Sequence, residues 1–235
     1  MATKPTRFPN GLSNVNPESF WGSFGAMSPT KYHQYFNDFN AFAAGDWTIT
    51  TVEAGGGSAS EAVTDKLGGA LLLINDAADN DYDNLILAGE GFQFTAGKKL
   101  WFEAKLQVSD ATQSDVFVGL AIKTATDPVG TAPTDGAFFR KDDGDTDVDF
   151  VVTKDSTATT STELATLADA TDITLSFYYN GVDNIAVWVN GGLVDNVAVT
   201  NIPDDELIAP MMHIQNGAAA AKTMTVDYIL AAQER

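Results

Sequence analysis

The densest group of chemically capable side chains is the acidic run from Asp142 to Asp149, in which five of eight residues are aspartate. Asp143, Asp145 and Asp147 stand at the i, i+2 and i+4 positions of a calcium loop, and calcium binds carboxylate and carbonyl oxygens. However, Val148 occupies the place of the glycine that an EF-hand requires, and Lys154 the place of its bidentate acid. The run therefore does not predict an EF-hand.

The same run could also support acid–base chemistry. Asp145, Asp147 and Asp149 alternate along an expected strand, so they point to one face, as the general acid and nucleophile of glycoside hydrolysis must. Their position beside Gly144, at a hairpin tip, is equally typical of a solvated acidic hairpin that resists edge-to-edge pairing. We favour the solvated hairpin, with a metal site of another type and catalysis as alternatives.

A second acidic cluster extends from Asn75 to Asn84. It supplies oxygen ligands for calcium, but no spacing within it requires a metal. We interpret it as a surface loop, with a metal site as the alternative, and the sequence assigns neither a metal ligand nor a cofactor.

Nucleophilic catalysis requires a base beside the nucleophile, and the chain contains only two histidines, His33 and His213. Both are interpreted as structural residues. The sequence contains no Gly-x-Ser-x-Gly elbow and no phosphate-binding glycine loop. No catalytic residue is predicted, and we expect the chain not to be an enzyme.

Two tryptophans lie out of phase with the apolar rows of their strands. Trp101 and Trp188 could stack against sugar rings on an outer face, or they could lie under a loop or at a subunit contact. They leave carbohydrate binding open.

The elements that must position these side chains are strands. Apolar residues alternate with mostly polar ones over residues 100–108, 116–122, 173–179, 185–189 and 224–230, which is typical of half-buried strands. Asp143-Gly144, Asn180-Gly181 and Asn190-Gly191 are hairpin dipeptides, and only a weak helical pattern occurs at 161–169. The sequence predicts an all-β, two-sheet antiparallel β-sandwich that forms a single domain over residues 38–235.

Residues 1–37 predict an extended N-terminal arm. Pro5, Pro9, Pro17 and Pro29 interrupt any helix, and the segment is rich in aromatic side chains that would be costly to leave in water. Its charge is +2, against −21 for the remainder. We expect the arm to dock either on its own domain or on a neighbour.

Composition excludes several classes of partner. The net charge of −19 argues against nucleic acid, because binding to the phosphate backbone depends on Lys and Arg. No run reaches the roughly 18 apolar residues of a membrane span, so no membrane partner is expected. There is no cysteine, hence no disulfide or thiolate metal site, and no apolar export signal follows Met1.

Two stretches resemble known families. Residues 174–194, with Asn180-Gly181 and Asn190-Gly191-Gly192, resemble the hairpins of concanavalin A-like and laminin-G-like jelly rolls, which implies a jelly-roll sandwich. Thr6-Arg7-Phe8-Pro9-Asn10-Gly11-Leu12 is similar to the opening segment of virion structural proteins of tailed phages.

The second resemblance implies a capsid decoration or cement protein. It would be made in the host cytoplasm and bind the major capsid protein on the outside of the virion as a homo-oligomer, often a trimer. The predicted partner-binding residues are Arg7, Phe8, Pro9, Phe20, Trp21 and Phe24. The alternatives are a carbohydrate-binding, lectin-like module with a glycan partner and, third, a glycoside hydrolase.

Overall fold

The structure, a computed structural model, describes residue 20 and residues 29–54, 56–124 and 126–235. In these residues the secondary structure consists of strands and one 3-10 turn at Ala44–Asp46. The strands are β1 (Tyr32–Asn37), β2 (Trp47–Val52), β3 (Ser60–Val63), β4 (Leu71–Ile74), β5 (Tyr82–Leu87), β6 (Leu100–Val108), β7 (Ser114–Ala121), β8 (Gly136–Lys141), β9 (Asp147–Lys154), β10 (Thr157–Thr166), β11 (Ile173–Tyr179), β12 (Asn184–Val189), β13 (Gly192–Ala198), β14 (Ala209–Asn216) and β15 (Thr223–Glu234). The described residues contain no helix that is long and apolar enough to cross a membrane.

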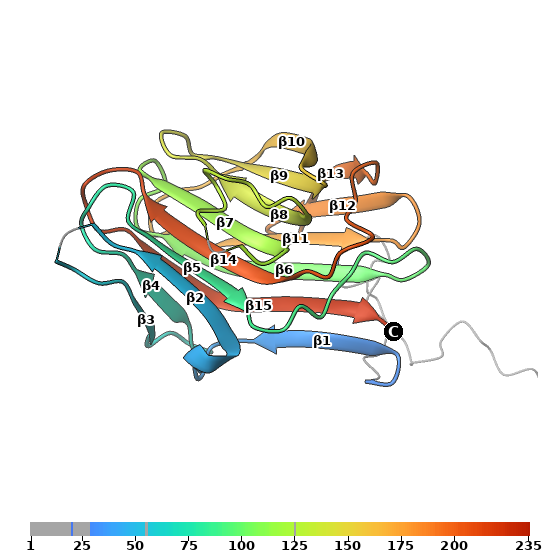
Figure 1. Cartoon of the computed structure of the whole chain (residues 1–235), viewed down its shortest axis with the longest axis horizontal. Coiled ribbons are helices and arrows are strands. Elements are labelled where there is room, and N and C mark those ends of the chain that lie inside the picture. The colour runs from blue at the N-terminus through green and yellow to red at the C-terminus, as the bar shows by residue number, and fades with distance from the viewer. Residues whose placement is uncertain (1–19, 21–28, 55, 125) are drawn as a thin grey trace, which may run out of the picture.

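The strands form two antiparallel sheets that pack against each other (Figure 1). One has the order β13-β12-β11-β6-β15-β4-β3, with β1 also paired to β15, and we call it the eight-stranded sheet. The other, the seven-stranded sheet, has the order β10-β9-β8-β7-β14-β5-β2. The predicted all-β sandwich is confirmed.

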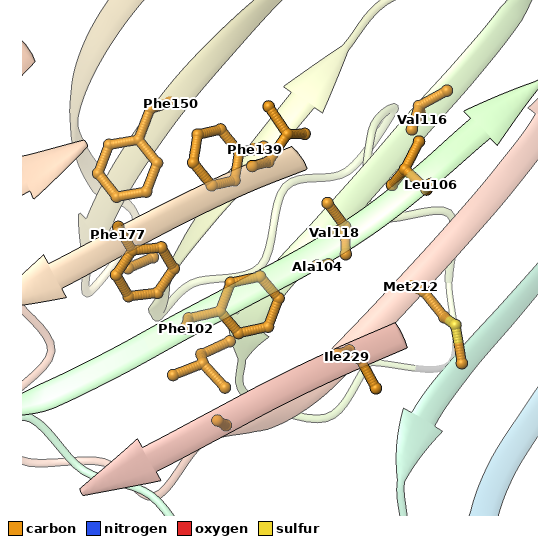
Figure 2. Close-up of a cluster of buried hydrophobic side chains, with 14 of the residues drawn as sticks. Phe102, Ala104, Leu106, Val116, Val118, Phe139, Phe150, Phe177, Met212 and Ile229 are labelled. Carbon is orange, nitrogen blue, oxygen red and sulfur yellow. The ribbon is translucent and has the colours of Figure 1, made fainter. Parts of the chain in front are cut away.

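The core lies between the sheets and follows from the alternation in the sequence. In β6, the side chains of Leu100, Phe102 and Leu106 are fully buried in it. Figure 2 shows phenylalanines of both sheets converging there; the ring of Phe177 lies 5.2 Å from those of Phe102 and Phe150. These aromatic contacts pack the two sheets against each other.

The hairpins form at the predicted dipeptides. Gly144, Gly181 and Gly191 all have positive φ, so β8–β9, β11–β12 and β12–β13 are joined by tight turns. The weak helical pattern at 161–169 is not a helix, because β10 continues to Thr166 through a bulge between Ser161 and Ala165. The bulge interrupts the regular alternation, which explains the misleading period.

The end of the arm belongs to the sandwich. Residues 32–37 form β1, which pairs with residues 229–234 of β15. The folded body therefore begins before the predicted boundary at residue 38.

Candidate functional site

Polar side chains gather on the outer face of the seven-stranded sheet, and we call them the outer polar cluster. On β14, Met212 and Ile214 face the core, so His213 and Gln215 point outward. The strand register places Asn84 of β5 opposite His213 and Asp115 of β7 opposite Gln215. The cluster comprises Tyr82, Asn84, Asp115, Asp127, His213 and Gln215.

Asp127 reaches the cluster from the segment 122–135, which connects β7 to β8. Its Oδ1 lies 3.4 Å from Nε2 of His213, and the His213 ring lies 5.3 Å from that of Tyr82. The carboxylate is oriented by its own turn, because the N–H groups of Val129 and Gly130 donate to Oδ1 at 2.8 Å and to Oδ2 at 2.9 Å. The turn therefore presents Asp127 to the sheet in a fixed orientation.

Further contacts anchor this segment to the sheet. Nδ2 of Asn84 donates to the carbonyl oxygen of Thr124 at 3.2 Å. Val129 packs on an apolar patch of the outer face to which Phe117, Phe138 and Met211 belong. The segment thus covers part of the outer face, and the outer polar cluster lies at the border of the segment.

Burial changes the acid–base properties of the cluster. His213 is completely buried, which lowers its pKa to about 4 although Asp127 acts in the opposite direction. Burial raises the pKa of Asp115 to about 6, and the negative charges of Asp127 and Asp143 contribute to the rise. Near neutral pH the cluster therefore holds a neutral imidazole, and its Asp115 carboxyl group takes up a proton at a higher pH than an ordinary aspartate does.

The cluster also has unused hydrogen-bonding capacity. Within the described part of the chain, three atoms have no hydrogen-bond partner: the two ring nitrogens of His213 and Oδ1 of Asn84. Buried polar atoms are normally paired with protein or water, so these atoms call for a partner, either a water molecule or a polar ligand. The arrangement can hold hydroxyl groups and transfer protons.

The acidic run 142–149 has local partners. Oδ1 of Asp147 accepts from Oγ1 of Thr166 at 2.9 Å, and Oδ1 of Asp149 accepts from the N–H of Glu163 at 2.9 Å. Oδ1 of Asp145 accepts from two N–H groups of its own turn. These bonds agree with the hairpin interpretation and not with carboxylates directed at a substrate.

Trp101 and Trp188 are on the outer face of the eight-stranded sheet, yet they are only 0% and 4% exposed. Phe20 lies edge-on to Trp188 with ring centroids 5.7 Å apart, and Tyr32 lies edge-on to Trp101 at 5.8 Å. The two tryptophans are therefore covered rather than available as open platforms for sugars.

The predicted partner-binding residues fall into two groups. Phe20 is 4% exposed and packs within the chain itself. The other five, Arg7, Phe8, Pro9, Trp21 and Phe24, lie outside the described residues. Of the two histidines, His33 has a structural place, because its Nε2 lies 2.8 Å from the carbonyl oxygen of Gly91 and its ring stacks on Phe92.

Comparison with known proteins relates this fold to solved structures, whereas no protein family and no curated protein matches the sequence. An endo-1,3-beta-glucanase from Streptomyces sioyaensis matches with a TM-score of 0.63 and 13% identity, over 89% of this chain and 99% of the glucanase. A protein of unknown function from Shewanella oneidensis MR-1 matches with a TM-score of 0.61 and 15% identity, over 99% of this chain and 97% of that one. The carbohydrate recognition domain of Emp46p, in a potassium-bound form, matches with a TM-score of 0.55 and 9% identity, over 83% of this chain and 94% of that domain.

These matches confirm the predicted concanavalin A-like jelly roll at the level of the fold. They also correct one expectation. The exclusion of enzymatic activity was wrong, because the neighbours include glucanases and a glucuronan lyase. Nothing in the comparisons supports a virion role.

Sequence reasoning missed the outer polar cluster. The outward phase of His213 was visible in the alternation of β14, but Asp127 lies in a segment without regular pattern. The strand order β5-β14-β7 is not the order of the chain, so the sequence offered no signal that Tyr82, Asp115 and His213 meet.

Proposed function

We propose that the chain is a carbohydrate-binding jelly-roll domain whose glycan site is the outer polar cluster. The observation that carries the proposal is the unused hydrogen-bonding capacity of His213 and Asn84 beside Asp127. Sugar hydroxyls both donate and accept hydrogen bonds, so they suit a neutral imidazole, an amide oxygen and a carboxylate. Glucanases and a carbohydrate recognition domain among the structural neighbours are consistent with this class of ligand.

A glycan array followed by calorimetry with the best ligand tests the proposal. We expect Asp127→Asn to weaken binding about tenfold or more, since a charge-assisted hydrogen bond is worth roughly 1.5–3 kcal/mol. Asp65→Asn is the matched control, because Asp65 is exposed in the connection between β3 and β4 of the other sheet. Equal affinity of Asp127→Asn and the control would contradict the site, and no binding to any glycan would contradict the function.

Cleavage of the bound glycan is a second candidate, favoured by the raised pKa of Asp115 in the same cluster as the neutral His213. Release of new chain ends from β-glucans and polyuronides would be assayed with the wild type and with Asp115→Asn. Loss of activity in Asp115→Asn with binding retained would support catalysis, whereas an inactive wild type that still binds would leave the protein a binding module.

A capsid decoration role remains a separate proposal that rests on residues 6–12 and on the basic, aromatic arm. In that proposal, Arg7, Phe8, Pro9, Trp21 and Phe24 contact the major capsid protein, and several copies assemble on the outside of a phage head. Co-sedimentation of the full chain with phage heads tests it, and free protein in the supernatant would oppose it.

A further inference from the structure

Five carboxylates meet at one rim of the sandwich, where β2 ends and the loop from β4 to β5 turns. We call them the rim carboxylates: Glu53, Glu61, Asp76, Asp81 and Asp83. Glu53, Asp76 and Asp81 each offer an oxygen, and these oxygens all lie within 4.8 Å of one another. Like charges at such separations repel strongly unless a cation or protons neutralise them.

Asp83 provides an independent indication that a ligand belongs here. It is 0% exposed, and neither of its side-chain oxygens has a hydrogen-bond partner among the described residues. Its surroundings are acidic, because the carboxylates of Glu61 and Glu53 are its charged neighbours. Burying a carboxylate without a partner costs free energy, so a partner is expected in the working protein.

The same is true of Glu53. Both of its carboxylate oxygens are buried, and among the described residues no donor meets them with good hydrogen-bond geometry, although the backbone N–H groups of Asp76 and Ala59 lie near. Among the ion pairs of the described residues, none involves a rim carboxylate. Within the part of the chain that the structure describes, no lysine or arginine is paired with this charge.

Backbone groups hold the rim carboxylates in place. The N–H of Ala54 donates to Oδ1 of Asp81 at 2.7 Å, which ties the end of β2 to the loop between β4 and β5. The loop is braced from β14, since Nδ2 of Asn216 donates to the carbonyl oxygens of Asp76 at 2.6 Å and of Ala78 at 2.8 Å. The chain thus fixes the mutual positions of these acids instead of letting them separate.

We infer that the rim carboxylates form a binding site for a divalent cation of the calcium type, with Glu53, Asp76 and Asp81 as ligands and Glu61 and Asp83 beside them. Calcium takes six to eight oxygens at variable angles, whereas magnesium requires near-ideal octahedral geometry and keeps several waters. The rim carboxylates are a dense, irregular group, so they fit the coordination that calcium takes better than the coordination that magnesium requires. The inference is independent of the glycan site, and either can fail alone.

Calorimetric titration of the full chain with calcium, after treatment with a chelator, tests the site. We expect saturable binding and, at about 100 times the Kd, a rise in Tm of roughly 5–10 °C, because a ligand that binds only the folded state stabilises it. Magnesium at the same concentration should give a much smaller shift. Absence of a calcium effect, or an equal effect of magnesium, would overturn the inference.

Asp83→Asn is the most informative variant, because its contact with the carboxyl group of Glu61 is the one side-chain interaction among the described residues that the substitution could alter. We expect calcium affinity to fall about tenfold or more, while the Tm of the metal-free protein stays the same or rises as one repelling charge is removed. Asp81→Asn should lose binding as well, and Asp147→Asn, in the other acidic run, should bind calcium like the wild type. A calcium response in Asp83→Asn and Asp81→Asn equal to that of the wild type would also overturn the site.

Discussion

At the scale of single residues, the molecule buries titratable groups inside the folded chain. His213 is the clearest case, because its ring is fully buried and, among the described residues, it is paired with the partly exposed Asp127. The folded chain therefore holds the imidazole neutral, while the unfolded chain would protonate it in mildly acidic solution.

This difference predicts an acid-sensitive stability. The pKa of His213 falls from the ordinary 6.5 to about 4 in the folded state, so its contribution is intact above about pH 6.5 and is lost as the pH falls toward 4. The full loss would be about 3 kcal/mol. Urea unfolding from pH 7 to pH 4 should therefore show a flatter pH dependence for His213→Gln than for the wild type.

The control for that experiment is His33→Gln, because His33 is partly exposed and hydrogen-bonded to Gly91. It should change the pH dependence less. If His213→Gln and the wild type lost stability in parallel, another buried group would be responsible for the acid sensitivity.

At the scale of elements, the seven-stranded sheet depends on one close approach. A Cβ added to Gly119 of β7 would lie 2.4 Å from Cα and Cβ of Phe138 on β8. The missing side chain lets Phe138 stack on Phe117 with ring centroids 4.4 Å apart, which forms the apolar patch under the segment 122–135. Gly119 thus allows the close spacing of β7 and β8, and this spacing forms the apolar surface under the segment that carries Asp127.

We expect Gly119→Ala to destabilise the protein by about 1–3 kcal/mol, because overpacking forces a strand or a ring to move. Gly89→Ala is the matched control, since nothing lies within 4 Å of the Cβ that it would add. Chemical unfolding measures both variants. Equal stability of Gly119→Ala and the wild type would mean that β7 and β8 separate without cost.

At the scale of the whole molecule, the net charge of −19 works against compactness. Raising the ionic strength from about 0.01 M to 0.15 M shortens the screening length from about 30 Å to 8 Å. We expect the Tm to rise over this range, measured by thermal unfolding in sodium chloride with a chelator present to keep the rim carboxylates free of divalent cations. A Tm independent of salt would show that the negative charges are already compensated.

The sequence predicted those features that depend on neighbours along the chain. The alternation of residues 100–108 and the turns at Asn180-Gly181 and Asn190-Gly191 are local, and they indicated the strands, the hairpins and the sandwich. The candidate site is not local, because it joins Tyr82, Asp115 and His213 through the order of strands. Similarly, the pattern put Trp101 on an outer face correctly, but it could not reveal that Tyr32 covers it.

One side of β15 is shared by two partner strands, and this arrangement has a practical consequence. Along one side it pairs with β6, while on the other side residues 223–226 pair with β4 and residues 229–234 pair with β1 (Figure 1). A chain shortened to start after Phe36 would lose nearly all of β1 and leave the second half of β15 as an open sheet edge, which promotes aggregation. Failure of such a truncated protein to bind a partner would then reflect insolubility, so recombinant versions should start before Tyr32.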